Sequence, residues 1–355
     1  MKPGSRPTAG AAFGRILGLS EPLVTIAIPT LAAGSALAEC LAALEEQTFR
    51  DFEVAVIDNS GRNLAAEAAA RWRGVNVIAN SWNVGFGAAV NQVFGCSRAR
   101  YLATLNDDTV PSPEWLGALV AAMEANPGAG MGASQIRLAG GVQLDSAGML
   151  LSSDGSSKQR GHLGPANAFL KQEDVLLPSG CAALYRRKML EEIGLFDEEF
   201  FLYCEDTDLG LRGRLAGWPC IYVPDALVEH RYSATAGAAS PVKAYYVERN
   251  RLFVLLKTFP ARLLIRSPGA AASRYLWHVF SALVGRGAAG AFRRQNAGVL
   301  EMAYIAVRAH LVLLKHAPRL LRQRGEIRRR ARLTSADFER LLKRYYISPR
   351  EVAAL

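Results

Sequence analysis

Short apolar runs rich in β-branched residues alternate with amphipathic stretches over the first 130 residues of the chain. The runs have the length and composition of buried strands, and the first amphipathic stretch carries Leu37, Leu41 and Leu44 on one helical face. Strands are expected at 23–30, 52–60, 75–80 and 101–108, and helices at 35–47, 64–73, 85–94 and 113–125. Strands that alternate with helices predict a parallel sheet with right-handed crossovers.

The pattern changes after Gly130 and again near Ser240. Short strands are expected at 130–138, 142–151 and 175–185, with a Gly/Ser-rich loop over 152–164 and short helices at 186–193 and 206–216. These strands should extend the sheet, some parallel and some antiparallel to their neighbours, in a mixed orientation. From Pro241 onward the pattern is helical, with helices expected at 242–258, 271–284, 298–315 and 318–332.

The chain is therefore expected to have three parts. These are an N-terminal extension over 1–21, an α/β domain over 22–240 and a basic helical region over 241–355. Half of the 355 residues are apolar, which predicts a folded core rather than disorder. Five scattered cysteines without a C-x-x-C pair argue against a disulfide framework or zinc knuckle and fit a reducing, cytoplasmic compartment.

No stretch of 18 uncharged apolar residues is present, so no transmembrane helix is expected, and Arg15 interrupts the apolar run that a signal peptide would need.

Positive charge is concentrated in the helical region. Residues 241–355 hold 23 lysines and arginines against six acidic residues, whereas the preceding 240 residues are net negative. Basic residues interleaved with apolar ones predict binding to an anionic membrane surface. A helical appendage with a solvated basic face is the plainer alternative, and nucleic acid is disfavoured because no nucleic-acid-binding motif accompanies the charge.

Polar clusters follow the strands of the predicted sheet. They are Pro29-Thr30, Asp58-Asn59 and Asn106-Asp107-Asp108. In open α/β sheets, ligands bind beyond the carboxyl ends of the strands. Adjacent carboxylates there can hold Mg²⁺ or Mn²⁺, which keeps waters and binds substrate phosphates. The alternative, an N-cap for the next helix, is disfavoured by Pro111 and Pro113.

Two further segments are less specific. NVGFGAAVN (83–91) places glycines before a helix, where the backbone can approach a ligand closely, but it is neither a Walker A nor a dinucleotide motif. His230 follows a probable strand, and a lone histidine is more often structural than a ligand. His162 has no partner in view.

The segment FLYCEDTDLGLR (201–212) places three carboxylates directly after bulky apolar residues. They form either a solvated helix start or a site in which one carboxylate acts chemically. Asp208 and Arg212 are four residues apart and predict an ion pair along the helix.

Taken in order, these motifs resemble the family 2 glycosyltransferases, and most closely the bacterial rhamnosyltransferases. The resemblance covers about residues 22–232 and is strongest over 179–218. It implies the glycosyltransferase-A fold, a Rossmann-like mixed α/β sheet with helices on both faces. It also implies an inverting transfer of a sugar from a nucleotide-activated donor to an acceptor hydroxyl.

The resemblance assigns roles to individual residues. Those expected on the nucleotide-sugar side are Pro29, Thr30, Asp58, Asn83, Gly85, Asn91, Asn106 and Asp107. Asp108 and His230 are expected to hold Mg²⁺ or Mn²⁺, although Asn106 replaces the first aspartate of the family's D-x-D motif. Asp206 is expected to be the catalytic base, with Glu205 and Gly180 on the acceptor side.

The resemblance also implies substrates and a location. It favours L-rhamnose transfer from dTDP-rhamnose to a cell-surface polysaccharide or polyprenyl-linked acceptor, by an enzyme peripherally bound to the inner face of the cell membrane. One alternative is a galactofuranosyl- or other hexosyltransferase that uses a UDP- or GDP-sugar. Another is a non-catalytic nucleotide-sugar-binding scaffold at the membrane, which the Asn106 substitution leaves open.

Overall fold

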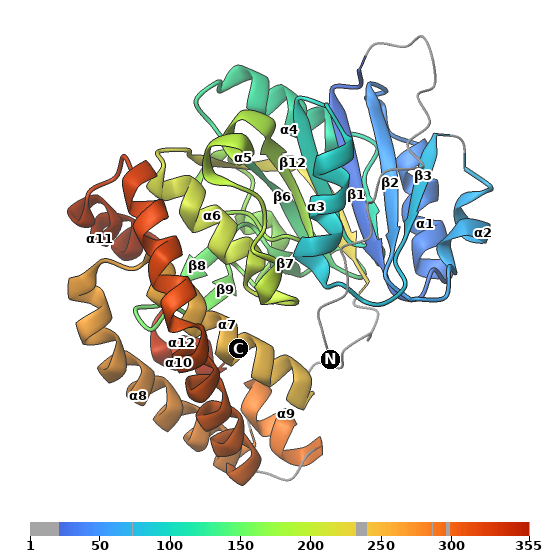
Figure 1. Cartoon of the computed structure of the whole chain (residues 1–355). Helices are drawn as coiled ribbons and strands as arrows, with labels where there is room; N and C mark the ends of the chain where they lie inside the picture. The colour runs from blue at the N-terminus through green and yellow to red at the C-terminus, as the bar shows by residue number, and fades with distance from the viewer. Residues whose placement is uncertain (1–20, 73, 232–239, 286, 296–298, 355) are drawn as a thin grey trace, which may run out of the picture.

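A mixed ten-stranded sheet lies at the centre of the molecule (Figure 1). The computed structural model describes residues 21–72, 74–231, 240–285, 287–295 and 299–354, so the expected extension over 1–21 lies outside it except for residue 21. The sheet order is β10-β12-β6-β11-β4-β1-β2-β3, with β5 added beside β12 and β7 beside β6. The strands are β1 Val24–Thr30, β2 Phe52–Asp58, β3 Val75–Ala79, β4 Tyr101–Leu105, β5 Thr109–Pro111, β6 Met131–Leu138, β7 Leu144–Ser146, β10 Glu173–Val175, β11 Ala182–Arg186 and β12 Cys220–His230.

Strands β4, β1, β2 and β3 are parallel, as the alternation of strands and helices predicts. Strand β11 is antiparallel to both β4 and β6, and β12 is parallel to β6, so the second half extends the sheet in the expected mixed orientation.

Helices cover both faces of this sheet. They are α1 Ser35–Glu45, α2 Ala65–Ala69, α3 Phe86–Cys96, α4 Trp115–Ala125, α5 Arg187–Ile193 and α6 Glu205–Leu215. Along β1, Ile26 and Ile28 face the core shared with α1 and α4, whereas Ala27 faces the core shared with α3, α5 and α6. This alternation is the period of two that a strand imposes on its side chains. The predicted α/β fold class is confirmed.

Several predicted boundaries in the second half are wrong. The strand expected over 142–151 is two, β7 and β8 (Met149–Leu151), because the chain turns at Gly148 with φ of 96°. The segment 175–185 likewise contains the end of β10 and most of β11. The loop expected over 152–164 contains β9 (Ser157–Gln159), which forms a hairpin with β8. In the first half, the helix expected over 64–73 is reduced to α2, Ala65–Ala69.

The C-terminal region is helical, as expected, and its helices gather on one side of the molecule near α6 and the β8–β9 hairpin (Figure 1). They are α7 Pro241–Thr258, α8 Ala261–Val284, α9 Gly287–Gln295, α10 Val299–Arg330, α11 Ser335–Arg344 and α12 Pro349–Ala354. Ser240 caps α7 by accepting a hydrogen bond from the Lys243 amide, and Pro241 occupies the first helical turn. Among the described residues, no helix is both long and apolar enough to cross a membrane.

Two of these helices continue through a proline, contrary to expectation. Helix α8 begins at Ala261 rather than at residue 271 and contains Pro268. A proline leaves the carbonyl four residues earlier without its usual donor, and the Ser267 hydroxyl donates to that carbonyl, Leu264 O, at 2.8 Å. Helix α10 likewise contains Pro318 and replaces the two helices expected at 298–315 and 318–332. Ala309 and Leu320 are buried on either side of this proline, which indicates that packing holds the helix together.

The helical region shares a hydrophobic core with the α/β domain. Leu211 and Leu215 of α6 and Leu151 of β8 pack with Phe253 of α7 and Leu320 of α10. The region therefore packs closely on the α/β domain.

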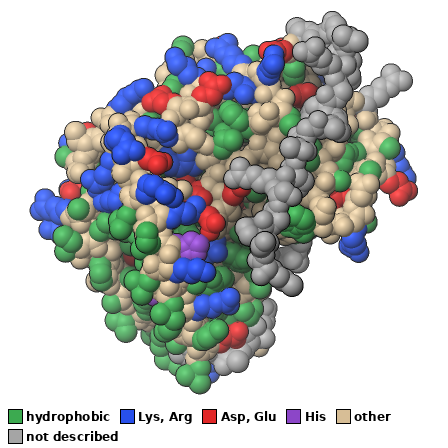
Figure 2. All heavy atoms as spheres, in the orientation of Figure 1, with side chains coloured by type: hydrophobic (Ala, Val, Ile, Leu, Met, Phe, Trp, Pro, Cys, Tyr) green, Lys and Arg blue, Asp and Glu red, His purple; other side chains and the backbone are tan. Residues whose placement is uncertain are grey.

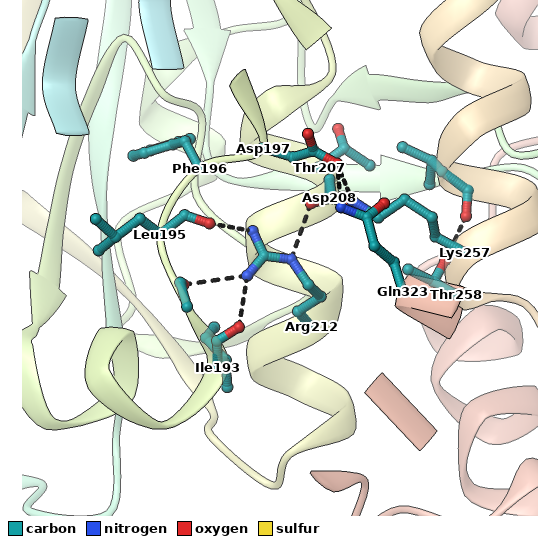
Figure 3. A network of polar contacts seen from close by, with 12 residues as sticks. Ile193, Leu195, Phe196, Asp197, Thr207, Asp208, Arg212, Lys257, Thr258 and Gln323 are labelled. Carbon is teal, nitrogen blue, oxygen red and sulfur yellow. Dashed lines mark hydrogen bonds and ion pairs between the residues drawn. The ribbon is translucent and has the colours of Figure 1, made fainter. Parts of the chain in front are cut away.

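A buried ion network joins the same elements (Figure 3). Lys257 Nζ of α7 lies 2.7 Å from both Asp197 Oδ2 and Asp208 Oδ1. The expected Asp208–Arg212 ion pair is confirmed at 2.8 Å. From α10, Arg319 contacts Asp197 at 3.0 Å. The network thus connects α6, α7, α10 and the loop before α6.

Candidate active site

The carboxyl ends of β1 and β4 meet the end of β12 at one edge of the sheet. Thr30 ends β1, residues 106–108 follow β4, and His230 ends β12. Strand β5 places Thr109 opposite His230, which brings the residues after β4 next to the end of β12. Strand β11 pairs Ala182 with Leu105, so Gly180 lies at the same edge.

Asp108, His230 and Asp145 form a compact cluster at this edge. His230 Nε2 lies 3.3 Å from Asp108 Oδ1, and its Nδ1 lies 2.9 Å from Asp145 Oδ2. His162 Nδ1 lies 3.1 Å from the other oxygen of Asp145. Asp108, Asp145 and His230 are buried. One carboxylate therefore orients two imidazole rings, and His230 presents its remaining nitrogen to Asp108.

The buried cluster shifts the pKa values of its members. Burial by itself would raise the pKa of Asp145, but hydrogen bonds from His162 and His230 lower it to about 2. Burial lowers the pKa of His230, but contacts with Cys181, Asp108 and Asp145 outweigh burial and leave it raised. Asp145 is thus an ionised hydrogen-bond acceptor at neutral pH.

Asp107 faces the end of β1. The Thr30 hydroxyl donates to Asp107 Oδ2 at 2.6 Å. Burial raises the pKa of Asp107, and the bond from Thr30 opposes that rise. The main chain of Asn106 is fixed by a bond from its amide to Cys181 O at 2.8 Å. Residues 106–108 are therefore held between β1, β11 and β12.

Asp206 lies at the N-terminus of α6 and faces the start of β11. Its Oδ2 accepts a hydrogen bond from the Gly180 amide at 2.9 Å, and its Oδ1 accepts one from the Thr207 amide at 2.6 Å. A Cβ on Gly180 would lie 3.3 Å from Asp206 Cβ, so glycine suits this close approach. Asp206 is half-buried and remains accessible, whereas Glu205 is buried.

The two neighbouring carboxyl groups have raised pKa values. Burial, together with the charge of Asp206, raises the pKa of Glu205 to about 8. Burial also raises the pKa of Asp206, while hydrogen bonds from the Gly180 and Thr207 amides limit the rise. Glu205 Oε2 is buried without a hydrogen-bond partner among the described residues. Glu205 is therefore suited to carry a proton at neutral pH, and Asp206 to accept one.

The loop before these carboxylates has an unusual backbone. Phe201, Tyr203 and Cys204 have φ values of 62°, 67° and 63°, in the left-handed region that non-glycine residues rarely adopt. Asn250 of α7, fully buried, holds the loop by donating from its amide to three carbonyls. They are Phe200 O at 2.9 Å, Leu202 O at 2.8 Å and Tyr203 O at 2.7 Å. A residue of the helical region therefore fixes the entry to α6.

Gly85 packs beneath the same loop. It has φ of 89°, and a Cβ there would lie 2.5 Å from Phe201 O. Asn83 accepts a hydrogen bond from the Gly85 amide at 2.9 Å, and the Phe86 amide donates to Phe201 O at 2.8 Å. These contacts give Asn83 and Gly85 a role in positioning the loop.

Two other predicted nucleotide contacts have their polar atoms engaged within the protein. Asp58 is fully buried, and its oxygens accept hydrogen bonds from the amides of Ser60 at 2.8 Å and Ala65 at 2.7 Å. Asn91 donates to Phe196 O at 2.9 Å and accepts from the Phe196 amide at 3.1 Å. Asp58 thus orders the loop after β2. Asn91 joins α3 to Phe196, which precedes the loop that leads to α6. Pro29 lies next to Thr30 at the end of β1.

Sequence reasoning did not identify Asp145, the link from it to His162, or Asn250. Asp145 lies in an apolar run that reads as a strand, and it is 85 residues from His230. Asn250 lies in a helical stretch among apolar and basic residues. No local spacing could have identified these contacts, because each joins distant segments of the chain.

The Asp108–His230 pair suits a divalent cation that completes its coordination with water and phosphate oxygens. A histidine ligand commonly has its second nitrogen held by a carboxylate, as Asp145 holds His230. Within the described ranges, no group of three His, Cys, Asp or Glu side chains converges on one ion position. The donor set therefore fits a metal shared with a bound substrate.

Comparisons with known proteins agree with this architecture. Residues 25–194, from β1 to α5, match the family model described as Glycosyl transferase family 2. The N-acetylglucosaminyl-diphospho-decaprenol L-rhamnosyltransferase of Mycobacterium tuberculosis is 29% identical over 243 residues, which are 62% of this chain and 79% of the relative. An uncharacterized protein of Sinorhizobium fredii, y4gI, is 28% identical over 234 residues, 61% of this chain and 25% of its own length.

Solved structures share the fold at low sequence identity. A mannosyltransferase from Pyrobaculum calidifontis, in complex with GDP-Man and Mn²⁺, has a TM-score of 0.51 at 16% identity, over 87% of this chain and 85% of that one. Residues 1–349 of TarS from S. aureus, in complex with UDP, have a TM-score of 0.50 at 15% identity, over 89% and 91% of the two chains.

The fold and the comparisons define a glycosyltransferase of the glycosyltransferase-A type. Residues 25–194 match the model of glycosyl transferase family 2, and the chain is similar to a mycobacterial rhamnosyltransferase. The predicted family is confirmed.

Proposed function

We propose that this glycosyltransferase acts with inversion and that Asp206 is its catalytic base. The observation that carries the proposal is the position of Asp206, accessible and held by Gly180 at the sheet edge that also carries Asp107, Asp108 and His230. Asp206 accepts the proton of the acceptor hydroxyl while the oxygen of that hydroxyl forms a bond to the anomeric carbon of the donor sugar. The bond from that carbon to the donor phosphate breaks, and its electron pair leaves with the nucleoside diphosphate.

The donor is proposed to lie along the carboxyl ends of β1 and β4. Pro29 and Thr30 would border the base and ribose, with Asp58, Asn83, Gly85 and Asn91 shaping the surrounding loops. Asn106 and Asp107 would face the diphosphate and sugar, and Glu205 and Gly180 would border the acceptor.

Asp108 and His230 would hold Mg²⁺ or Mn²⁺. When bound, this cation supplies positive charge that offsets the charge of the leaving diphosphate.

We further propose L-rhamnose from dTDP-rhamnose as the donor sugar and a cell-surface glycan or polyprenyl-linked molecule as the acceptor. The similarity to the mycobacterial enzyme, whose name specifies rhamnosyl transfer to a decaprenol-linked sugar, supports this choice. The alternatives are a UDP- or GDP-linked hexose donor, or a binding protein without catalytic activity.

Binding of dTDP-rhamnose with Mn²⁺ is expected to raise the Tm by a few degrees, because a ligand that binds the folded state stabilises it. UDP- and GDP-sugars should produce smaller shifts. Asp108→Asn should remove the Mn²⁺-dependent part of the shift, which differential scanning fluorimetry with and without EDTA measures. A shift with UDP- or GDP-sugars but not with dTDP-rhamnose would contradict the donor assignment. Binding without turnover on a matched acceptor would favour the scaffold alternative.

The surface of the helical region supports peripheral binding at the inner face of the cell membrane. Helix α10 exposes an apolar stripe, defined by Leu300, Tyr304, Val307, Leu311, Leu314 and Leu321. Successive members are three, four or seven residues apart, so they lie on one helical face. Figure 2 shows hydrophobic side chains gathered over this part of the molecule, with lysine and arginine side chains nearby. An apolar face beside basic residues is typical of helices that lie on anionic membranes.

Replacing Leu300, Leu311 and Leu314 with serine is expected to weaken binding to anionic phospholipid vesicles by at least tenfold, because each exposed leucine would otherwise leave water on binding. Co-sedimentation measures this. The matched control replaces Val142 and Leu170, which are exposed on the α/β domain, and it should bind as the wild type does. Equal binding by both variants would refute the membrane proposal.

A further inference from the structure

A cavity of about 520 Å³ lies between the C-terminal helices and the β8–β9 hairpin. Most of its wall is apolar and comes from α7, α8, α9 and α10. Apolar side chains that line it include Val247, Val279, Phe292, Met302, Ile305 and Val307. Its volume is within the range of small-molecule sites, about 300–1,000 Å³. None of the residues assigned above to the donor or the metal lines it.

One end of this cavity is cationic. Lys158 of β9 and Lys243 of α7 line it. Neither ammonium has a hydrogen bond or ion pair with any residue that the structure describes. The acidic residue at this end, Glu248, is already paired with Arg251 and Arg274. Burial, together with the charges of Lys243 and Arg274, lowers the pKa of Lys158 to about 8. Two unpaired ammonium groups in a partly buried site favour an anionic ligand.

The cationic end lies beside the loop that leads to Asp206. Cys204, two residues before Asp206, lines the cavity. Lys243 Nζ lies 5.6 Å from the centre of the Tyr203 ring. Ser157, which also lines the cavity, contacts the hydroxyl of Thr207 at 2.8 Å. A ligand held by the two lysines would therefore have its head next to the proposed base.

The apolar part of the cavity reaches the protein surface. Val247, Val279 and Val307 line it and are also exposed, by 38%, 37% and 59%. Val307 belongs to the apolar stripe of α10. A hydrocarbon chain could thus pass from a membrane on that stripe into the cavity while remaining in contact with apolar side chains.

We propose that this cavity binds the acceptor lipid, with its phosphate between Lys158 and Lys243 and its hydrocarbon chain in the apolar part. The inference rests on the proposed function, because it assigns the cavity to the acceptor of the transfer. A purely polar acceptor would leave the apolar walls unused, and a neutral lipid would leave the two lysines without a counter-charge. A phosphate-headed amphiphile matches both ends.

The test uses farnesyl phosphate as a short, soluble probe, with inorganic phosphate and farnesol as the separate halves of the ligand. Calorimetric titration of the full chain should give affinity for farnesyl phosphate at least tenfold above that for either half. Lys158→Ala and Lys243→Ala should each weaken it on the order of tenfold, the effect of losing one charged hydrogen bond. Ala303→Trp, at an exposed position on the cavity wall, should weaken it by obstructing the apolar part.

The control is Lys315→Ala, which removes an exposed lysine of α10 outside the cavity and should bind farnesyl phosphate as the wild type does. Inorganic phosphate binding as tightly as farnesyl phosphate would reduce the cavity to an anion site and overturn the proposal. Binding unchanged in all three cavity variants would also overturn it.

The shift in Tm with dTDP-rhamnose and Mn²⁺ is measured on the same samples. If that shift persists and farnesyl phosphate does not bind, only the cavity proposal fails. If no nucleotide sugar shifts the Tm, the proposed function is wrong, and the cavity proposal, which rests on it, is wrong as well.

Discussion

Replacing Asp206 with asparagine is expected to lower kcat by about 10²–10⁴-fold, the usual contribution of a general base. Asparagine keeps the shape of the side chain and can still accept a hydrogen bond from Gly180 or Thr207, so the fold and donor binding should persist. Rates of sugar transfer and the donor-induced shift in Tm together measure this. Loss of donor binding would mean that Asp206 supports the structure of the donor site instead.

Glu205→Gln is the matched control. Burial and the charge of Asp206 raise the pKa of Glu205, which favours its neutral form, and glutamine mimics that form. Its rate should remain within a few-fold of the wild type. The wild-type rate should fall on the acid side, since Asp206 acts only when ionised, and the fall should begin above the ordinary pKa of aspartate because burial raises it. A large loss in Glu205→Gln with a small loss in Asp206→Asn would reverse the assignment.

Lys257→Met is expected to lower the free energy of unfolding by about 3–5 kcal/mol, the typical cost of removing one member of a buried ion pair. Lys257 is 2% exposed, and Asp208 is completely buried, so the variant leaves a carboxylate oxygen in the interior without its cation (Figure 3). Arg212 still pairs with Asp208, and Arg319 with Asp197, but neither replaces the lysine between the two carboxylates.

Urea denaturation measures this loss as a lower midpoint with an unchanged slope. Lys315→Ala, which removes an exposed lysine of the same helical region, should change the stability by less than about 0.5 kcal/mol. A cost below about 1 kcal/mol for Lys257→Met would mean that the two carboxylates are stabilised without Lys257, and the network would not hold the helices to the α/β domain.

The first half of the fold follows closely from sequence because its information is local. Strand β1 begins one residue from its expected start and β4 at its expected start, since apolar runs and their polar ends mark each boundary. The helical region was less predictable. Pro268 and Pro318 indicate breaks, yet side-chain hydrogen bonding and packing carry α8 and α10 through them.

The candidate site was predictable to the extent that its motifs follow strands. Asp107, Asp108 and His230 come together because β4 and β12 end, and β5 begins, at one edge. The role of Asp145 depends on pairing between segments 85 residues apart, which no spacing rule reveals. Asp58 and Asn91 were expected near the nucleotide, but their polar atoms bind the protein's own main chain, and only the tertiary structure could establish this.

The contact of Asn250 with the loop over 200–203 limits how this enzyme could be recombined with its relatives. A chimera that joined residues 1–230 to the C-terminal half of another family member would keep every residue assigned to the donor, the metal and the base. Unless the other protein supplied an asparagine at the position of Asn250, the chimera would lose the amide that holds three carbonyls of the loop leading to Asp206. The left-handed residues of that loop would then be free to relax. The unit that can be exchanged therefore includes α7, and a junction placed between the sheet and the helices would separate the base from its support.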